Sequence, residues 1–274
     1  MNSMQIKDKL RNVANKKEIS FNTILRLYMY DRFIERLAMS EYKDNFILKG
    51  GFYLSTLFGI ENRTTMDIDA AFKNDTFTEN NIKRMITSII NIDLEDNAKL
   101  ELENISSIRN EDIYKGFRVV INVKIENMKE NFQIDIATGD PITPKEINYQ
   151  YLPILGDNKI NLWAYNIESV LAEKIETILS RLEANSRIRD YYDIYLIYTK
   201  DWKNINKNNF KKAVEKTFEK REFNEDIVKS FTIIKNSKLL QTRWEGYSKK
   251  YNYAKNISFI EVIECLDKVI TEII

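Results

Sequence analysis

The sequence predicts an α+β protein, with a mixed α/β lobe over residues 1–160 and an all-helical lobe over residues 161–274. Alternating apolar residues, typical of strands, occur only in the first part, whereas helical spacing of apolar residues runs through the second. The three prolines, Pro141, Pro144 and Pro153, all lie near the junction. Because proline lacks a backbone donor and disfavours helix interiors, we expect their segment to be a connection.

The first lobe is expected to contain a mixed sheet with flanking helices. Helical spacing predicts helices over 20–42, 51–58 and 78–90, and Thr78 is a suitable N-cap for the last of them. Strand patterns cover 66–72, 100–106, 117–125 and 132–137. Apolar and polar residues alternate most clearly in 117–125.

The second lobe reads as six helices, at 166–183, 187–199, 208–220, 224–236, 239–251 and 258–274. Asn166 is a good N-cap for the first of these. The sequence shows no internal repeat.

Composition excludes several kinds of chemistry. The 274 residues are 43% hydrophobic, which suffices for one large or two modest cores. The chain has no histidine and a single cysteine, Cys265, so an internal disulfide, histidine catalysis and the usual zinc sites are excluded. Any metal must therefore be bound by oxygen. The N-terminus has no apolar signal segment and no apolar run spans a bilayer, so we expect a cytoplasmic protein without a membrane partner.

Charge is distributed unevenly along the chain. Residues 200–255 carry 15 Lys or Arg against 7 Asp or Glu, although the whole chain has a net charge of only +1. A basic lobe beside an acidic one suits a polyanion such as RNA. Ordinary solvated helix faces are the alternative interpretation.

Two short motifs predict a phosphate and metal site. Gly50 and Gly51 open a helix, where backbone N–H groups and the helix dipole favour an anion. Asp67 and Asp69 are two residues apart on a predicted strand, so both carboxylates project from one face. Two converging carboxylates repel each other unless a cation such as Mg²⁺ lies between them.

A third carboxylate lies in the last predicted strand of the first lobe. Phe132, Ile134 and Ile136 share one face of that strand, and Asp135 points to the other. Aspartate is disfavoured in the middle of a strand, so we expect a compensating role. Asp135 is a candidate second-metal ligand or base in phosphoryl transfer, and an edge-strand aspartate facing solvent is the alternative.

The order of these motifs resembles the DNA polymerase β-like nucleotidyltransferase superfold, and the helical half resembles the AbiEii family of bacterial abortive-infection, type IV toxin–antitoxin toxins. The resemblance covers about residues 45–200. It is carried by four segments: Leu48-Lys49-Gly50-Gly51, Thr64-x-x-Asp67-x-Asp69, Leu171-Ala172-Glu173-Lys174 and Arg189-Asp190-Tyr191-Tyr192-Asp193-Ile194-Tyr195. One departure is that Gly51 stands where many members of the superfold have serine.

The resemblance implies a toxin that transfers a nucleoside monophosphate from an NTP, either GTP or a pyrimidine triphosphate, to an acceptor such as tRNA, blocking growth in phage defence. It implies Mg²⁺ or Mn²⁺ held by Asp67 and Asp69, with Asp135 as a further ligand or the group acting on the acceptor. It also implies a cognate antitoxin, whose direct contact with the toxin stays open. The implied nucleotide-binding residues are Lys49, Gly50, Gly51, Thr64 and Arg189.

Lys174 lies on or beside the apolar stripe of the first helix of the second lobe. There it either extends along the surface to solvent or reaches into a cleft to contact phosphate, and the motif context favours phosphate. Asp190 and Asp193 share a face of the next helix. One of them is expected to position Lys174 or the nucleotide, and the other to cap the helix or pair with Arg189. All three are candidate catalytic residues.

Three alternatives remain at this level. Asp-x-Asp also binds the metal of sugar nucleotides in glycosyltransferases, although the Gly50-Gly51 helix and Asp135 argue against that class. A nucleotidyltransferase could act on a protein or a small molecule instead of RNA. A non-catalytic RNA-binding module on a transferase scaffold is the third.

Overall fold

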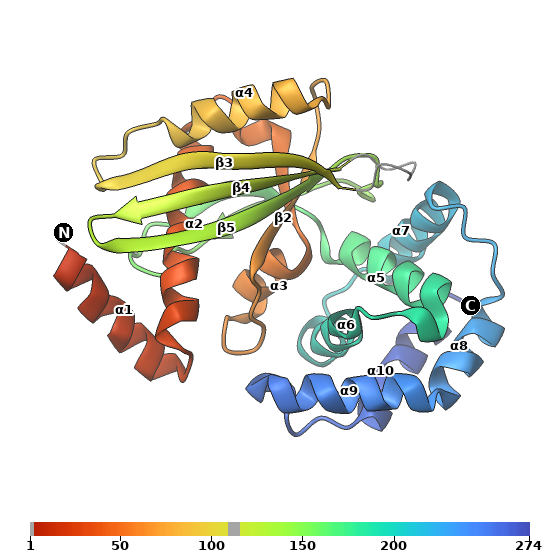
Figure 1. The fold of residues 1–274 in the computed structure, drawn as a ribbon. Helices are drawn as coiled ribbons and strands as arrows, with labels where there is room; N and C mark the ends of the chain where they lie inside the picture. The colour runs from red at the N-terminus through yellow and green to blue at the C-terminus, as the bar shows by residue number, and fades with distance from the viewer. Residues whose placement is uncertain (1–2, 109–115) are drawn as a thin grey trace. The chain divides into compact units, whose positions relative to one another are not determined.

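The structure is a computed structural model that describes residues 3–108 and 116–274. The chain divides into two compact units (Figure 1). Unit 1 comprises Met1–Gly139 and Ile147–Ala164, and unit 2 comprises Asp140–Glu146 and Tyr165–Ile274. Each unit is described by itself below.

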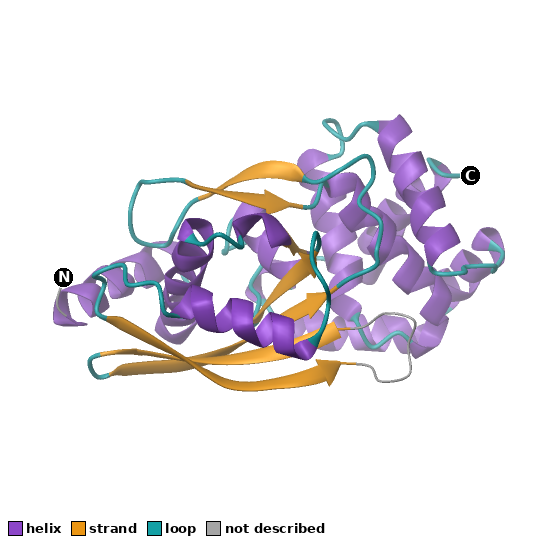
Figure 2. Ribbon diagram, turned by 90° about the horizontal axis from the view of Figure 1, so that it is seen from above, coloured by secondary structure: helices purple, strands orange, loops and turns teal. Residues whose placement is uncertain are grey.

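Unit 1 is built on one mixed sheet of seven strands in the order β3-β4-β5-β2-β1-β7-β6 (Figure 2). The strands are β1 (Phe46–Lys49), β2 (Asp67–Phe72), β3 (Ala98–Ile108), β4 (Gly116–Ile125), β5 (Met128–Ala137), β6 (Ile147–Tyr151) and β7 (Ile160–Ala164). Strand β2 runs parallel to β5, and β1 runs parallel to β7. The other neighbouring pairs are antiparallel, so the predicted mixed sheet is confirmed.

The helices of unit 1 are α1 (Ser3–Lys17), α2 (Phe21–Met39), α3 (Gly50–Phe58) and α4 (Glu79–Ile90), with a short 3-10 helix, η1 (Lys43–Asn45). Helix α2 contacts β5, α3 contacts β1 and β2, and α4 contacts β3. The contacts are aromatic in the middle: the Tyr30 ring lies 5.7 Å from that of Phe52 and 4.9 Å from that of Phe132. Burial of these large side chains supplies much of the hydrophobic stabilisation of unit 1.

Strands β4 and β5 are apolar on one side of the sheet, where α2 contacts β5, and mainly polar on the other. Along β5, Phe132, Ile134 and Ile136 are at most 2% exposed, whereas Gln133 and Asp135 are half-buried. The predicted alternation in this strand is therefore confirmed. Strand β5 lies between β4 and β2, so Asp135 does not stand on an edge strand.

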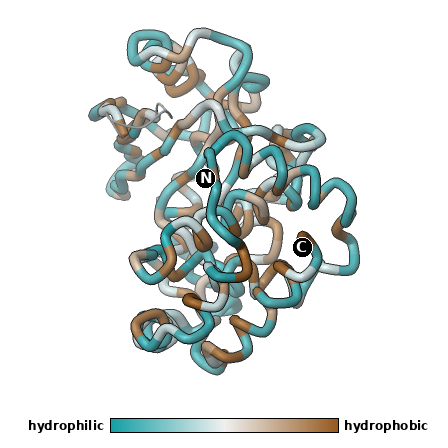
Figure 3. Tube along the Cα trace, turned by 90° about the vertical axis from the view of Figure 1, so that its right-hand side faces the viewer, coloured by the Kyte–Doolittle hydropathy of each residue, from teal (hydrophilic) through white to brown (hydrophobic). Residues whose placement is uncertain are grey.

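Unit 2 contains six α-helices within the described residues. They are α5 (Ile167–Arg181), α6 (Ile188–Asp201), α7 (Lys207–Lys220), α8 (Ile227–Asn236), α9 (Lys238–Lys250) and α10 (Phe259–Thr271), with 3-10 helices η2 (Leu182–Ala184) and η3 (Asn252–Ala254). Side-chain N-caps begin five of them, including Asn166 before α5 and Ser258, part of a capping box, before α10. In Figure 3 brown and teal turns alternate along the trace, as expected for helices with one apolar side.

Among the α-helices and strands described, four were not predicted from the sequence: α1, β1, β6 and β7. The segment from Pro141 to Pro153, predicted as a connection, contains β6, which pairs antiparallel with β7. Pro141, Pro144 and Pro153 all lie outside that strand, so none removes a donor from the β6–β7 ladder. Among the helices described, none is long and apolar enough to cross a bilayer.

Candidate active site

The predicted first-lobe residues meet on the polar side of the sheet in unit 1. Strand register sets Lys49 of β1 opposite Asp69 of β2, Asp69 beside Asp135 of β5, and Asp135 opposite Arg118 of β4. Residues at matching positions point to the same face, so these four side chains form one row across four strands. We call Lys49, Asp69, Asp135 and Arg118 the aspartate row. Asp67 lies on the same face, one step along β2.

The Gly50-Gly51 pair makes room for Asp69. Gly50 has φ +62°, and a Cβ placed on it would stand 2.3 Å from Asp69 Oδ2. The Gly51 N–H donates a hydrogen bond to the same oxygen at 3.2 Å. Asp69 is therefore held against the N-terminus of α3, where the helix dipole favours a negative charge. Only glycine meets both the backbone and the steric demand at position 50.

Arg63 and Thr65 occupy the space where a side chain at Gly51 would lie. A Cβ on Gly51 would stand 2.8 Å from Arg63 Nη2 and 3.2 Å from Thr65 Oγ1. Arg63 is 2% exposed, and its guanidinium also donates to the Thr64 carbonyl. At position 51, where many members of the superfold have serine, this chain has glycine, and the buried Arg63 guanidinium lies where a side chain would be. Arg63 is not among the residues that the sequence predicts for the site. Thr64 is among them, but the hydroxyl that faces Gly51 belongs to Thr65.

Two hydroxyl groups fix the start of β2, which carries both aspartates of the Asp-x-Asp motif. Tyr30 Oη of α2 donates to the Met66 carbonyl at 2.5 Å, and Thr65 Oγ1 donates to the Asp67 carbonyl at 3.2 Å. These contacts hold the backbone on both sides of the first aspartate.

Arg118 compensates for Asp135 in the middle of its strand. Its Nε and Nη2 donate to the two Asp135 carboxylate oxygens at 2.8 and 2.7 Å. The hydrogen bond to Asp135 raises the pKa of Arg118, and the charges of Asp135, Asp67 and Asp69 act in the same direction against a lowering by burial. Arg118 therefore interacts electrostatically with all three carboxylates. Arg118 is not among the residues that the sequence predicts for the site.

Asp67 and Asp69 are the carboxylates on this face whose chemistry suits a divalent cation. Across the part of the chain that the structure describes, no three Asp, Glu or Cys side chains converge so as to hold a metal ion. Asp135 instead contacts Arg118 with both oxygens. Two carboxylates that share a face fit Mg²⁺, which takes one or two carboxylates and completes its shell with phosphate and water.

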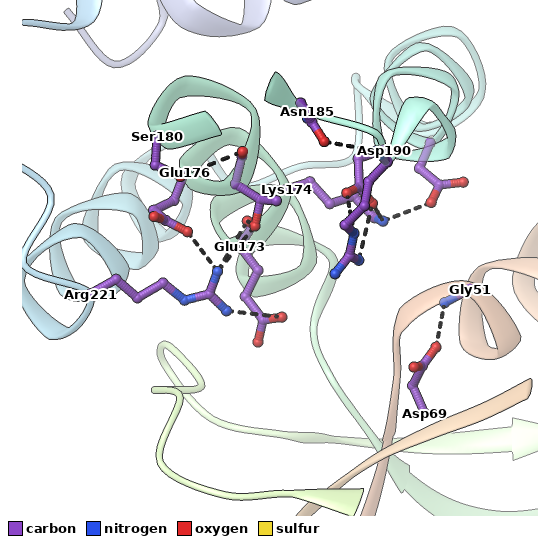
Figure 4. A network of polar contacts seen from close by, with 12 residues as sticks. Gly51, Asp69, Glu173, Lys174, Glu176, Ser180, Asn185, Asp190 and Arg221 are labelled. Atoms are coloured by element: carbon purple, nitrogen blue, oxygen red, sulfur yellow. Dashed lines mark hydrogen bonds and ion pairs between the residues drawn. The ribbon is translucent and has the colours of Figure 1, made fainter. Parts of the chain in front are cut away.

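Lys174 of α5 is buried within unit 2 between two aspartates of α6. Its Nζ lies 2.7 Å from Asp190 Oδ1 and 2.7 Å from Asp193 Oδ2 (Figure 4). Lys174 is 6% exposed and both aspartates are 0% exposed, so the lysine does not extend along the surface to solvent. Burial lowers the pKa of Lys174, but the facing Asp190 and Asp193 outweigh it and leave the pKa raised.

The arginine that pairs with this cluster is Arg187. Its Nε donates to Asp190 Oδ2 at 2.8 Å, whereas Arg189, the expected partner, is exposed and has no ion pair within the described ranges. Burial raises the pKa of Asp190, but Lys174 and Arg187 outweigh it and leave the pKa lowered. Asp190 and Asp193 both contact the Lys174 ammonium, so neither is its only carboxylate partner.

Arg221 forms a second polar cluster beside Lys174 in the same unit. It donates to Asp140 at 3.0 Å. It also donates to Glu176 at 2.7 Å, and its Nη2 lies 3.5 Å from Glu173 (Figure 4). These contacts tie the C-terminal end of α7 to α5 and to the segment 140–146. The helix that carries Lys174 is therefore fixed by ion pairs on both sides.

The fold is that of a nucleotidyltransferase. A crystal structure described as a nucleotidyltransferase from H. pylori matches 93% of this chain and 97% of its own, with 14% identity and a TM-score of 0.50. JHP933 from Helicobacter pylori matches equally well, with 14% identity, 93% and 94% coverage and a TM-score of 0.50. No curated protein sequence matches significantly.

The family is narrower than the fold. Residues 32–264 match the model of the nucleotidyl transferase AbiEii toxins of type IV toxin–antitoxin systems. The chain therefore belongs to the AbiEii family, as the sequence motifs predicted, and it is a nucleotidyltransferase. The family implies an NTP substrate, usually a divalent metal, and a cognate antitoxin.

Proposed function

We propose that this protein transfers a nucleoside monophosphate from GTP or a pyrimidine triphosphate to RNA, with tRNA the first acceptor to examine, and that this transfer blocks growth in phage defence. The observation that supports it best is the aspartate row. It sets Asp69 against the N-terminus of α3, beside Asp135 and one step from Asp67. The family membership favours this class of reaction over a glycosyltransferase and over a non-catalytic module.

The residues of unit 1 divide into two roles. Asp67 and Asp69 would hold Mg²⁺ or Mn²⁺, and the bound ion would offset negative charge on the triphosphate and on the leaving pyrophosphate. The N-terminus of α3, with Lys49 in the neighbouring row position, offers positive charge to the phosphates. The buried Arg63 adds a cation at the same helix end.

Asp135 is the group in the row that suits the acceptor. An acceptor hydroxyl attacks the α-phosphorus, a P–O bond forms, and the bond to pyrophosphate breaks. Asp135 accepts a hydrogen bond from that hydroxyl and is placed to take its proton. Arg118 holds both Asp135 oxygens, which fixes the carboxylate in one orientation while leaving a lone pair on each oxygen.

Lys174, Asp190 and Asp193 form the second candidate site. We propose that the cluster positions the Lys174 ammonium for phosphate, with Arg187 and the exposed Arg189 as further cations near the start of α6. Thr64 remains a proposed nucleotide contact. A protein or small-molecule acceptor is the alternative to RNA.

Substitution of Asp67 or Asp69 by asparagine tests the proposal. Each variant should lose transfer of label from [α-³²P]NTP and lose toxicity in cells, because a neutral amide binds a divalent cation weakly. The unfolding midpoint should hold or rise, because one of two neighbouring negative charges is removed. Asp157→Asn, an aspartate in the β6–β7 loop, is the matched control. Near wild-type transfer by either site variant would contradict the metal-site proposal.

The acceptor is identified in the same assay. Total RNA and total protein extract are offered separately with each labelled NTP, and the labelled fraction is resolved on a gel. Label in RNA supports the proposal, and label in protein alone contradicts the RNA acceptor while leaving the nucleotidyltransferase chemistry intact.

A further inference from the structure

We infer that the polar face of β3, β4 and β5 binds the sugar–phosphate backbone of a single-stranded RNA acceptor and leads its end to the aspartate row. The inference rests on the proposed function, from which it takes the RNA acceptor. It assigns acceptor binding to a surface of unit 1, whereas the sequence pointed to the lysine-rich helices of unit 2. The strands concerned lie side by side in Figure 1.

Three lysines stand abreast on this face. Strand register sets Lys99 of β3 opposite Lys124 of β4, and Lys124 opposite Lys129 of β5. We call Lys99, Lys124 and Lys129 the lysine row. All three are exposed, and within residues 3–108 and 116–274 none has a hydrogen-bond or ion-pair partner.

Such an arrangement works against the stability of the sheet. Like charges directly opposite each other on neighbouring strands are destabilising, and here two such pairs share the central lysine. A bound anion would remove that repulsion. Functional surfaces are the usual places where a fold retains an arrangement that lowers its own stability.

The lysine row lines a hollow of about 640 Å³ in unit 1. Asn122 and Asn131 line it too, together with Glu101 and Glu130. Arg26 of α2 pairs with Glu130 at 3.3 Å, which leaves Glu101 as the carboxylate that opposes the three ammonium groups. The hollow is therefore net positive and suits a polyanion.

The lysine row and the aspartate row share two neighbouring strands, β4 and β5. Along β5, residues Lys129, Asn131, Gln133 and Asp135 alternate onto the same face, and Lys124, Asn122, Val120 and Arg118 lie opposite them on β4. Three steps of two residues span about 20 Å at strand rise, a length that a few nucleotides of extended strand cover. The amides between the two ends can donate to and accept from ribose and bases of any sequence.

An extended polyanion fits this track better than a folded protein does. The track follows the strand direction and places the three lysines at the end distant from Asp135. Phosphates upstream of the reacting hydroxyl would lie over the lysine row, and each phosphate contact releases counterions.

Three variants with the same loss of charge separate the possible surfaces. The first is Lys99→Gln/Lys124→Gln/Lys129→Gln, in the lysine row. The second is Lys211→Gln/Lys212→Gln/Lys216→Gln, on α7 of the basic unit 2. The control is Lys16→Gln/Lys43→Gln/Lys83→Gln, three exposed lysines spread over α1, η1 and α4. Binding of a fluorescent RNA oligonucleotide with a single-stranded 3′ end is measured by anisotropy across salt concentrations, with transfer and unfolding measured in parallel.

The lysine-row variant should bind the oligonucleotide at least tenfold more weakly than the control and show a salt slope shallower by about 2, from three lost contacts to a single strand. Its KM for RNA should rise with little change in kcat or NTP binding, and its unfolding midpoint should hold or rise as repulsion is relieved. Weaker binding only in the α7 variant would overturn the inference in favour of unit 2. Unchanged RNA binding in both, or label found only in protein with all three variants alike, would also overturn it. RNA binding lost in the lysine-row variant, without any transfer to RNA by the wild type, would support the surface and contradict the proposed function.

Discussion

Replacement of Lys174 by alanine should strongly destabilise unit 2. The substitution leaves Asp190 and Asp193, both 0% exposed, without the ammonium that lies 2.7 Å from each. Removal of one partner from a buried ion pair typically costs about 3–5 kcal/mol, because the remaining charge stays buried without compensation. Arg187 keeps its contact with Asp190, so we expect a loss within that range. Urea unfolding followed by circular dichroism measures the loss.

A neutral version of the cluster separates stability from catalysis. The triple variant Lys174→Met/Asp190→Asn/Asp193→Asn removes every charge of the lysine–aspartate contacts at nearly constant volume, so stability should return to within about 1–2 kcal/mol of wild type. If the Lys174 ammonium stabilises charge in the transition state, turnover of this folded variant should still fall by on the order of 10². Lys174→Arg should restore activity only in part, since a planar guanidinium does not replace a compact ammonium held between two carboxylates.

Two outcomes would refute this reasoning. A loss below about 1 kcal/mol for Lys174→Ala would mean that the cluster is hydrated and not buried as described. A folded neutral triple variant with wild-type turnover would make the cluster purely structural. The pH dependence of the free energy of unfolding gives an independent check. The fold raises the pKa of Lys174 above its ordinary value of 10.5. The stabilisation that the Lys174 charge contributes should therefore be complete below pH 10.5 and be lost only as pH rises through the pKa of the folded state.

Two further predictions concern unit 1. Gly50→Ala should abolish transfer and lower the free energy of unfolding by about 1–2 kcal/mol or more, because φ +62° disfavours alanine and its Cβ would lie 2.3 Å from Asp69 Oδ2. The control is Gly246→Ala, at a helical position with open space, which should leave transfer unchanged and stabilise the protein slightly. Equal effects of the two substitutions would contradict the fit between Gly50 and Asp69. Asp31 is fully buried, accepts hydrogen bonds from Tyr151 Oη and Ile154 N, and has its pKa raised by burial from 3.8 to about 7. Its folded form therefore binds a proton more tightly, so stability should fall by up to about 4 kcal/mol as pH rises from about 4 to about 7, and denaturant titrations should show a flatter profile for Asp31→Asn; equal slopes for variant and wild type in that window would contradict the assignment.

The sequence predicted the residues of the unit 1 site better than it predicted their partners. The two-residue spacing of Asp67 and Asp69 and the apolar alternation around Asp135 place each carboxylate on a strand face without further information. Partners across strands depend on register. The Asp135–Arg118 pair follows once β4 and β5 are joined by the two-residue turn at Glu126 and its neighbour, where Glu126 has φ +49°. Recognition of that turn would have identified Arg118.

The remaining elements that the sequence did not predict are short or have a weak pattern of apolar residues. Strand β1 has only four residues and begins with three consecutive apolar ones, so it offers no period of two. Strand β6 does alternate, with Asn148 and Gln150 between apolar or aromatic residues, but it has only five residues and lies between the prolines that predicted a connection. Helix α1 is rich in lysine and buries only Ile6, Leu10 and Ala14. The lysine row was not predictable either, because the register of β3 against β4 shifts at an irregularity between Leu102 and Asn104. The sequence does predict Asp190 and Asp193 as candidate partners of Lys174. It predicts Arg189 as the arginine that pairs with them, whereas the structure has Arg187 paired with Asp190.

The turn between β4 and β5 bears on how this family can change over evolutionary time. A single register sets both the Asp135–Arg118 pair and the Lys124–Lys129 pair. Insertion or deletion of one residue in the turn would move alternate side chains to the opposite face and disrupt both pairs in one mutational step. Homologues that keep the chemistry should therefore vary in length elsewhere, for example between β6 and β7, and keep this hairpin at constant length.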